Sequence, residues 1–84
     1  MPTLGELVLH ARRRYGFTLR RVGLNVHGPR GDTRIDYLWR DSPRAFAPLP
    51  DYRDDQRLTE NLVRSLCAQL GIPPEDFGLT EEGP

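Results

Sequence analysis

Two apolar stripes at helical spacing stand near the two ends of this 84-residue chain. The first stripe consists of Leu4, Leu7, Val8, Ala11 and Tyr15. The second consists of Leu58, Leu62, Leu66 and Leu70, widened by Val63 and Cys67. Apolar residues that recur every three or four positions predict an amphipathic helix, which must bury its apolar side against another element. The residues between the stripes therefore have to supply a surface that covers both of them.

Capping residues bound both predicted helices. Thr3 and Gly16 flank the first stripe, and Thr59 and Gly71 are the predicted N-cap and C-cap of the second helix. Thr3 is followed by Glu6 at the spacing of a capping box, which predicts a helix over residues 4–15. The second helix is predicted between Thr59 and Gly71.

Three short strands are predicted between the helices: Phe17 to Leu24, Thr33 to Asp41 and Ala45 to Leu49. A loop rich in Gly and Pro, residues 25–32, joins the first two. The first strand loses its alternation at Arg21-Val22-Gly23, which predicts a bulge. The third strand contains Pro48, which has no backbone donor for a ladder, so we expect it at the edge of the sheet.

The middle strand divides into two faces of different character. One face carries Thr33, Ile35, Tyr37 and Trp39, and the other carries Arg34, Asp36, Leu38 and Arg40. We expect the aromatic side to be buried under the helices, with Tyr37 and Trp39 in the core. The side with the charged residues is then expected on the open face of the sheet.

Two helices that flank a three-stranded meander can bury both stripes only on one side of the sheet. The sequence therefore predicts an α+β fold, a two-layer α-β-β-β-α sandwich whose three-stranded antiparallel sheet has both helices on one face. A single domain spans residues 1–84, with an ordered core over about residues 3–79. Phe77 and Leu79 are expected to fold back onto that core, ahead of an acidic tail at residues 80–84.

The cysteine content and the short apolar runs restrict the cellular compartment and the kinds of site that we expect. Cys67 is the one cysteine, which excludes an intramolecular disulfide framework and a multi-cysteine zinc site and fits a reducing, cytoplasmic compartment. Cys67 lies on the apolar stripe and is expected to be a buried small hydrophobe rather than a nucleophile. The chain opens with no charged-then-apolar leader and has no long apolar run, so we expect no membrane span. We also expect no cofactor and no metal site.

The formal net charge is zero, but the two halves of the chain differ in sign. Residues 1–50 carry nine Arg and four acidic residues, whereas residues 51–84 carry three Arg and eight acidic residues. Two interpretations stay open: the halves neutralise each other within the fold, or the basic half contacts a polyanion. For the second, the candidate nucleic-acid-binding residues are Arg12, Arg13, Arg14, Arg20, Arg21, Arg30, Arg34 and Arg40.

The order of elements, and the last third of the chain above all, resembles a known family. The matching segments are Pro48-Leu49-Pro50, the run from Leu62 to Phe77 that contains Leu70-Gly71-Ile72-Pro73, and, more weakly, Tyr15-Gly16-Phe17. They resemble the third strand, second helix, closing segment and first turn of the HicA family of bacterial toxins, small RNA-cutting proteins with a fold like the double-stranded-RNA-binding domain. The resemblance implies an RNA-associated domain with an antitoxin-like protein partner, and it leaves the oligomeric state open.

The chain departs from that family at its catalytic residue. HicA-type toxins carry a Gly-Ser-His segment at the start of the middle strand, whereas this chain has Gly31-Asp32-Thr33 or, in a poorer alignment, Gly23-Leu24-Asn25, neither of which contains His. A Thr hydroxyl cannot take a 2′-hydroxyl proton near neutral pH as imidazole does. The chain is therefore either inactive or a metal-independent ribonuclease with a relocated base, for which His27 is the candidate. His10 is expected on the surface.

A second function stays open beside RNA binding. In this alternative the chain is a non-catalytic protein-interaction module, which docks a partner through its acidic second half or through the third strand with its prolines.

Overall fold

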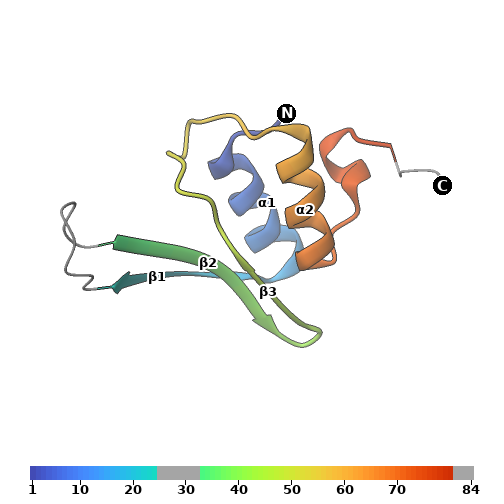
Figure 1. Ribbon diagram of the computed structural model, residues 1–84. Helices are drawn as coiled ribbons and strands as arrows, with labels where there is room; N and C mark the ends of the chain where they lie inside the picture. The colour runs from blue at the N-terminus through green and yellow to red at the C-terminus, as the bar shows by residue number, and fades with distance from the viewer. Residues whose placement is uncertain (25–32, 81–84) are drawn as a thin grey trace.

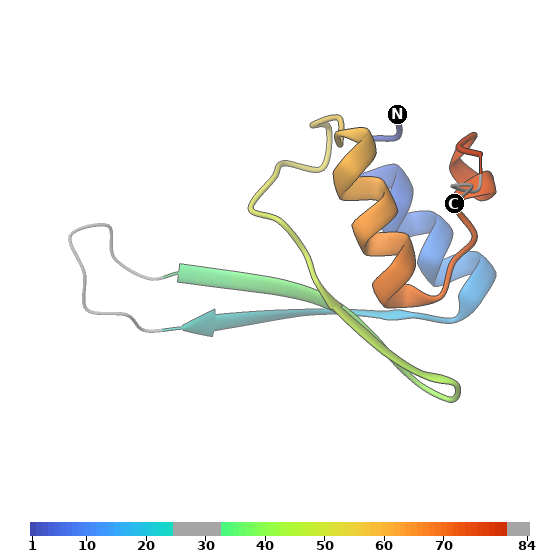
Figure 2. The same cartoon turned by 45° about the vertical axis from the view of Figure 1, so that its right-hand side comes forward.

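The computed structural model describes residues 1–24 and 33–80, with residues 22–24 and 33–34 as backbone only. The elements in chain order are α1 (Leu4–Tyr15), β1 (Thr18–Leu24), β2 (Thr33–Asp41), β3 (Arg44–Pro48), α2 (Glu60–Leu70) and the short 3-10 helix η1 (Pro74–Phe77). The three strands form an antiparallel sheet in the order β1-β2-β3. Both α-helices lie side by side on one face of this sheet (Figures 1 and 2), so the predicted two-layer α+β architecture is confirmed.

Local capping defines the ends of α1 as the sequence predicts. The Thr3 hydroxyl accepts a hydrogen bond from the Glu6 amide at 3.2 Å, and the Thr3 amide donates to the Glu6 carboxylate at 3.2 Å. This reciprocal pair satisfies two groups that a helix start leaves unpaired. Gly16 ends the helix with φ 72°, a left-handed conformation that costs glycine little.

The connector between β3 and α2 runs back to the start of α1. The amides of Leu4 and Gly5 donate to the carbonyls of Gln56 and Asp54 at 3.0 and 2.9 Å. These bonds satisfy first-turn donors that have no partner within the helix. A Cβ at Gly5 would lie 3.0 Å from the Asp54 carbonyl oxygen, so a larger residue would need the connector to move by a few tenths of an ångström. The connector is therefore part of the folded unit.

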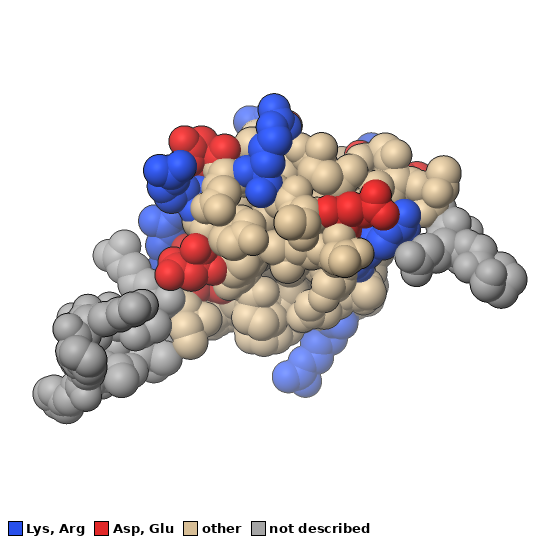
Figure 3. All heavy atoms as spheres, turned by 45° about the horizontal axis from the view of Figure 1, so that its top comes forward, with Lys and Arg blue, Asp and Glu red and all other residues tan. Residues whose placement is uncertain are grey.

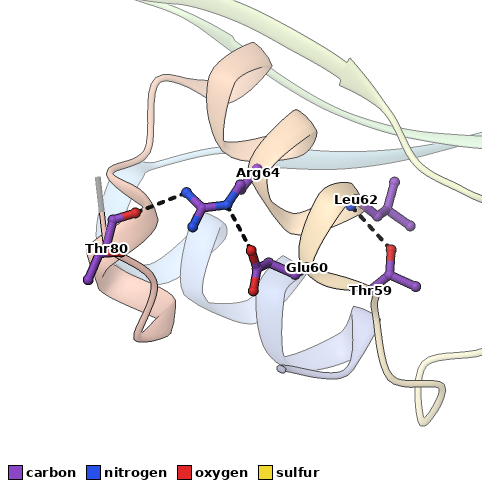
Figure 4. A network of polar contacts seen from close by, with 5 residues as sticks. All are labelled: Thr59, Glu60, Leu62, Arg64 and Thr80. Carbon is purple, nitrogen blue, oxygen red and sulfur yellow. Dashed lines mark hydrogen bonds and ion pairs between the residues drawn. The ribbon is translucent and has the colours of Figure 1, made fainter. Parts of the chain in front are cut away.

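Polar contacts along α2 hold the last described residues in place (Figure 4). The Thr59 hydroxyl accepts from the Leu62 amide at 3.2 Å, as expected of an N-cap. Arg64 pairs with Glu60 at 3.2 Å and donates to the Thr80 carbonyl at 2.9 Å. Leu79 is buried and Phe77 packs against the core, which confirms that the segment after α2 folds back.

The core lies between the helices and the middle of the sheet. Its buried members come from every layer: Leu4, Leu7, Val8, Ala11, Phe17, Leu38, Ala47, Leu58, Val63, Leu66, Cys67, Leu70, Ile72 and Leu79. On the sheet, Leu38 is the register partner of Leu19 on one side and of Ala47 on the other. Leu38 and Ala47 are both fully buried, and Leu19 packs against them. This row of three side chains forms the floor beneath the helices.

The expected assignment of the two faces of β2 is wrong. The face with Leu38 lies under the helices, and the face with Ile35, Tyr37 and Trp39 is the open one: Ile35 is 40% exposed, and the two aromatic rings are only half-buried. The reason lies in the neighbouring strands. Ala47 on β3 is small and aliphatic, so the helices can approach the sheet on the Leu38 side more closely than aromatic rings would allow.

Charged residues on the helix side of β2 contact neighbouring groups at the partly exposed border of the core, where Asp36 Oδ1 has no hydrogen-bond partner among the described residues. Asp36 pairs with Arg21 of β1 at 3.5 Å, and Arg40 donates to the Tyr15 carbonyl at 2.8 Å. Hydrogen bonds and opposite charges offset the cost of removing charged groups from water. The helix side therefore tolerates these residues at the border of the core.

The predicted bulge in β1 is also wrong. Pairing runs without a slip from Thr18 opposite Trp39 to Leu24 opposite Thr33. The interrupted alternation has another cause: Arg20 lies on the open face, and its neighbour Arg21 faces Asp36 on the helix side. β1 starts at Thr18, and β3 is an edge strand as its prolines predict. The predicted loop at residues 25–32 and nearly all of the predicted acidic tail lie outside the described residues.

Two alanine variants test which face is buried. Leu38→Ala should lower the free energy of unfolding by about 2–5 kcal/mol, because it opens a cavity beneath the helices. Phe46→Ala should cost about 1 kcal/mol or less, because Phe46 is already 54% exposed on the opposite face. Urea unfolding followed by circular dichroism measures both. A larger loss for Phe46→Ala than for Leu38→Ala would contradict the arrangement.

Candidate nucleic-acid interface

The face of the sheet that no helix covers carries aromatic and cationic side chains. Residues directly opposite each other in a ladder point to the same side, so the register defines this face row by row. One row joins Thr18, Trp39 and Phe46, and the next joins Arg20, Tyr37 and Pro48. Figures 1 and 2 show both helices on the other side. We call this surface the open sheet face.

Three aromatic rings form one patch on the open sheet face. The ring centroids of Tyr37 and Phe46 lie 4.9 Å apart with planes tilted by 46°. Trp39 is the register partner of Phe46, which places its ring next to that pair. The indole Nε1 of Trp39 is buried and has no hydrogen-bond partner among the described residues. The polar edge of the Trp39 indole is therefore turned away from the solvent.

Arginines surround this patch. A hollow on the open sheet face is lined by the three rings together with Arg20 from β1 and Arg40 and Arg44 from β2 and β3. Neither Arg20 nor Arg44 forms an ion pair with a described residue, and both are exposed. Asp41, the register partner of Arg44, lines the same hollow and offsets part of its charge. The hollow combines rings that can stack with guanidinium groups that can bind anions.

Arg40 has a structural role in addition to lining the hollow. Its Nε donates to the Pro43 carbonyl at 2.9 Å and its Nη1 to the Tyr15 carbonyl at 2.8 Å. Its Cζ lies 4.4 Å from the centroid of the Phe17 ring. These contacts join the β2–β3 turn to the end of α1, and they hold the Arg40 guanidinium on the helix side of the strand.

The structure divides the predicted arginine candidates among separate surfaces. Arg20 and Arg40 line the hollow on the open sheet face, whereas Arg12 and Arg21 line a different hollow between α1 and the sheet. Arg13 and Arg14 lie with His10 on α1. All three arginines at the end of α1 are exposed. Their predicted role in nucleic-acid binding stays a prediction.

Some predicted residues lie outside what the structure describes, and others were missed. His27 and Arg30 belong to the undescribed residues, and Arg34 is described only as a backbone position opposite Gly23. Arg44 and Phe46 were not predicted as site residues. The sequence signal for them was the alternation of side chains along the third strand. The register places both Arg44 and Phe46 on the same face of the sheet as Trp39.

His10 takes part in a contact that the sequence did not predict. Its Nε2 lies 2.9 Å from the Asp76 carboxylate, which also accepts a hydrogen bond from the Tyr15 hydroxyl. The His10 ring meets the Tyr15 and Phe77 rings edge-on, with centroids 5.6 and 5.2 Å away. The hydrogen bonds from Tyr15 and then His10 lower the pKa of Asp76, and the same carboxylate raises the pKa of Tyr15. This cluster fastens η1 to α1.

Asp76→Asn should reduce the loss of folding stability that the protein shows at acid pH. The pKa of Asp76 in the folded protein lies below its ordinary value of 3.8, so its contribution to stability is present above that value and is lost as the pH falls through the lower folded-state pKa. Urea unfolding at a series of pH values from about 7 to about 2 should show a smaller acid loss in the variant. Glu75→Gln, from the same turn, is the control and should keep the wild-type profile.

Cys67 has the environment of a core residue. It is 2% exposed, and burial raises the pKa of its thiol to about 11. Since the thiolate is the reactive form, iodoacetamide at about pH 8 should leave Cys67 unmodified in the folded protein and modify it after unfolding in urea. Mass spectrometry measures the difference. Fast modification of the folded protein would contradict the buried placement.

Between residues that the structure describes, the two charged halves of the chain form few direct ion pairs with each other. Among the described residues, Arg21–Asp36 lies within the basic half, and Arg53–Asp55 and Arg64–Glu60 lie within the acidic half. The contact between His10 and Asp76 crosses between the halves. Figure 3, which looks down from the helix side, shows basic and acidic residues next to one another around a largely uncharged centre. The described residues in this view form no continuous cationic surface.

No family model, curated protein or solved structure matches this chain. In the part of the chain that the structure describes, no helix is long and apolar enough to cross a bilayer. The described residues also contain no cluster of three or more His, Cys, Asp and Glu side chains arranged to hold a metal ion.

Proposed function

We propose that this chain is a small RNA-binding domain that acts in the cytoplasm, related to the HicA-type toxins, and that the open sheet face is its binding surface. One observation carries the proposal: the helix-free side of the sheet combines the aromatic rings of Tyr37, Trp39 and Phe46 with the exposed guanidinium groups of Arg20 and Arg44.

The chemistry of RNA suits this combination. Each phosphate carries a negative charge that an arginine fork can meet with two hydrogen bonds. RNA loops and ends also present bases that stack on aromatic side chains. The open sheet face offers both kinds of contact within one hollow, whereas Arg12 and Arg21 line a separate hollow beside Leu9 and Leu19.

The proposal is confined to binding. Cleavage needs a group that takes the proton of a 2′-hydroxyl, and the candidate for that role, His27, lies outside the described residues. Asp41 is the carboxylate that lines the hollow, and its register partner is Arg44. The role of His27 as a base stays a prediction.

A protein partner is the second candidate, supported by a different surface. The hollow between α1 and the sheet has apolar walls that include Leu9, which is 44% exposed, together with Leu19 and Leu49. Charges of both signs, from Arg12 and Asp54, line its rim. An apolar hollow with a mixed polar rim is the usual composition of a protein–protein interface.

A salt titration tests RNA binding and locates it. For a single-stranded RNA, the logarithm of the affinity should fall linearly with the logarithm of salt concentration. Arg20→Ala/Arg44→Ala should weaken binding at low salt and reduce that slope by about 1.4, because two phosphate contacts to a single strand are lost. Fluorescence anisotropy with a labelled oligonucleotide measures both.

The matched control removes the same number of positive charges from a different surface. Arg12→Ala/Arg13→Ala, at the exposed end of α1, should keep most of the wild-type affinity. If this control lost more affinity than Arg20→Ala/Arg44→Ala, the RNA contacts would lie on α1 instead. No binding of the wild-type protein at low salt would end the RNA proposal and leave the protein partner.

A further inference from the structure

We infer that the open sheet face binds unpaired bases, so that the substrate is a single-stranded RNA segment with two adjacent bases stacked on the aromatic patch, one on Trp39 and the next on the Tyr37–Phe46 pair. This inference rests on the proposed function and names the class of RNA that the same site takes.

The aromatic rings of the patch are placed where a base face can reach them. Tyr37 and Phe46 already contact each other, with centroids 4.9 Å apart, and Phe46 is 54% exposed. In a duplex each base is covered above and below by its neighbours, so its face cannot reach a protein ring. Aromatic rings that gain energy from contact with a base face therefore favour a strand whose bases are not paired.

The spacing of the rings along β2 also favours a single strand. Tyr37 and Trp39 are two residues apart on β2, which separates their Cα atoms by about 6.7 Å along an extended strand. Stacked bases within one strand are separated by about 3.4 Å. Two neighbouring bases can each occupy one ring position only if they come apart from each other. A flexible single strand can do this, and a regular helix cannot.

The positive charges of Arg20 and Arg44 lie on both sides of the rings. Arg20 is opposite Tyr37 on the edge strand β1, and Arg44 lies two residues before Phe46 on the other edge strand, β3. The guanidinium groups thus flank the rings from both edges of the sheet. A strand that crosses the sheet obliquely can place bases on the rings while its phosphates reach arginines on either side.

The chain provides its own probe, because Trp39 is the one tryptophan. A base stacked on its indole should quench its fluorescence, whereas a phosphate held at a distance should not. The experiment titrates the full chain with three RNAs: a single-stranded uridine octamer, an abasic octamer with the same number of phosphates, and a blunt duplex. Anisotropy of labelled oligonucleotides reports binding, and indole fluorescence reports stacking.

The expected result separates phosphate contacts from base contacts. The uridine octamer should quench Trp39 and bind at least about 10-fold more tightly than the abasic octamer, since stacking contributes to affinity at each base. The abasic octamer and the duplex should bind weakly, through phosphates alone, and leave the fluorescence unchanged.

A pair of apolar substitutions supplies the matched control. Phe46→Ala should weaken binding of the uridine octamer about 10-fold and leave the abasic octamer unaffected. Leu9→Ala also removes a partly exposed apolar side chain, but from α1. It should leave the affinities for both octamers unchanged. Circular dichroism confirms that both variants are folded.

Each other outcome has a distinct meaning. Equal affinity for the uridine and abasic octamers, or tighter binding of the duplex, overturns base stacking but leaves RNA binding in place. No binding of any RNA at low salt overturns the proposed function itself. Equal loss in Phe46→Ala and Leu9→Ala overturns the assignment of the bases to the aromatic patch.

Discussion

A single row of side chains across the sheet, Leu19, Leu38 and Ala47, determines the rest of the structure. These residues are partners in consecutive strands, and they form the floor on which the helices rest. Because side chains alternate along a strand, placing this row inside forces the neighbouring positions outward. Tyr37, Trp39 and Phe46 are therefore outside as a consequence of packing on the opposite face. The candidate site depends on the same register that builds the core.

The helices could be predicted from the sequence because their signals are local. The box formed by Thr3 and Glu6, and the glycine at position 16, act within a few residues of the element that they bound. The faces of the sheet have no such local signal. Alternation in β2 divides its side chains into two sets, but the choice between them depends on Leu19 and Ala47 in other strands. Aromatic content favoured the wrong set, because it ignored how small Ala47 is.

The candidate site was predictable only in part, for the same physical reason. Arg20 was identified because it lies in an arginine-rich stretch, whereas Arg44 and Phe46 became visible only through the pairing of β3 with β2. The contact between His10 and Asp76 joins residues 66 positions apart, and neither residue has a local feature that points to the other. Contiguous arginines can also mislead. A helix turns its side chains in different directions, so Arg12 lines a different hollow from its neighbour Arg13.

The contacts that hold the domain together also prepare the open sheet face for a ligand. Arg40 is held by two carbonyl oxygens and the Phe17 ring, which fixes the β2–β3 turn beside the hollow before anything binds. The rings of Tyr37 and Phe46 already pack on each other. Groups that are ordered in the free protein lose little entropy on association, which favours affinity. Arg20 and Arg44 form no ion pair with a described residue, and they have to be ordered by the ligand. Binding energy at this face should therefore come mainly from the rings, with the exposed arginines contributing the dependence on salt.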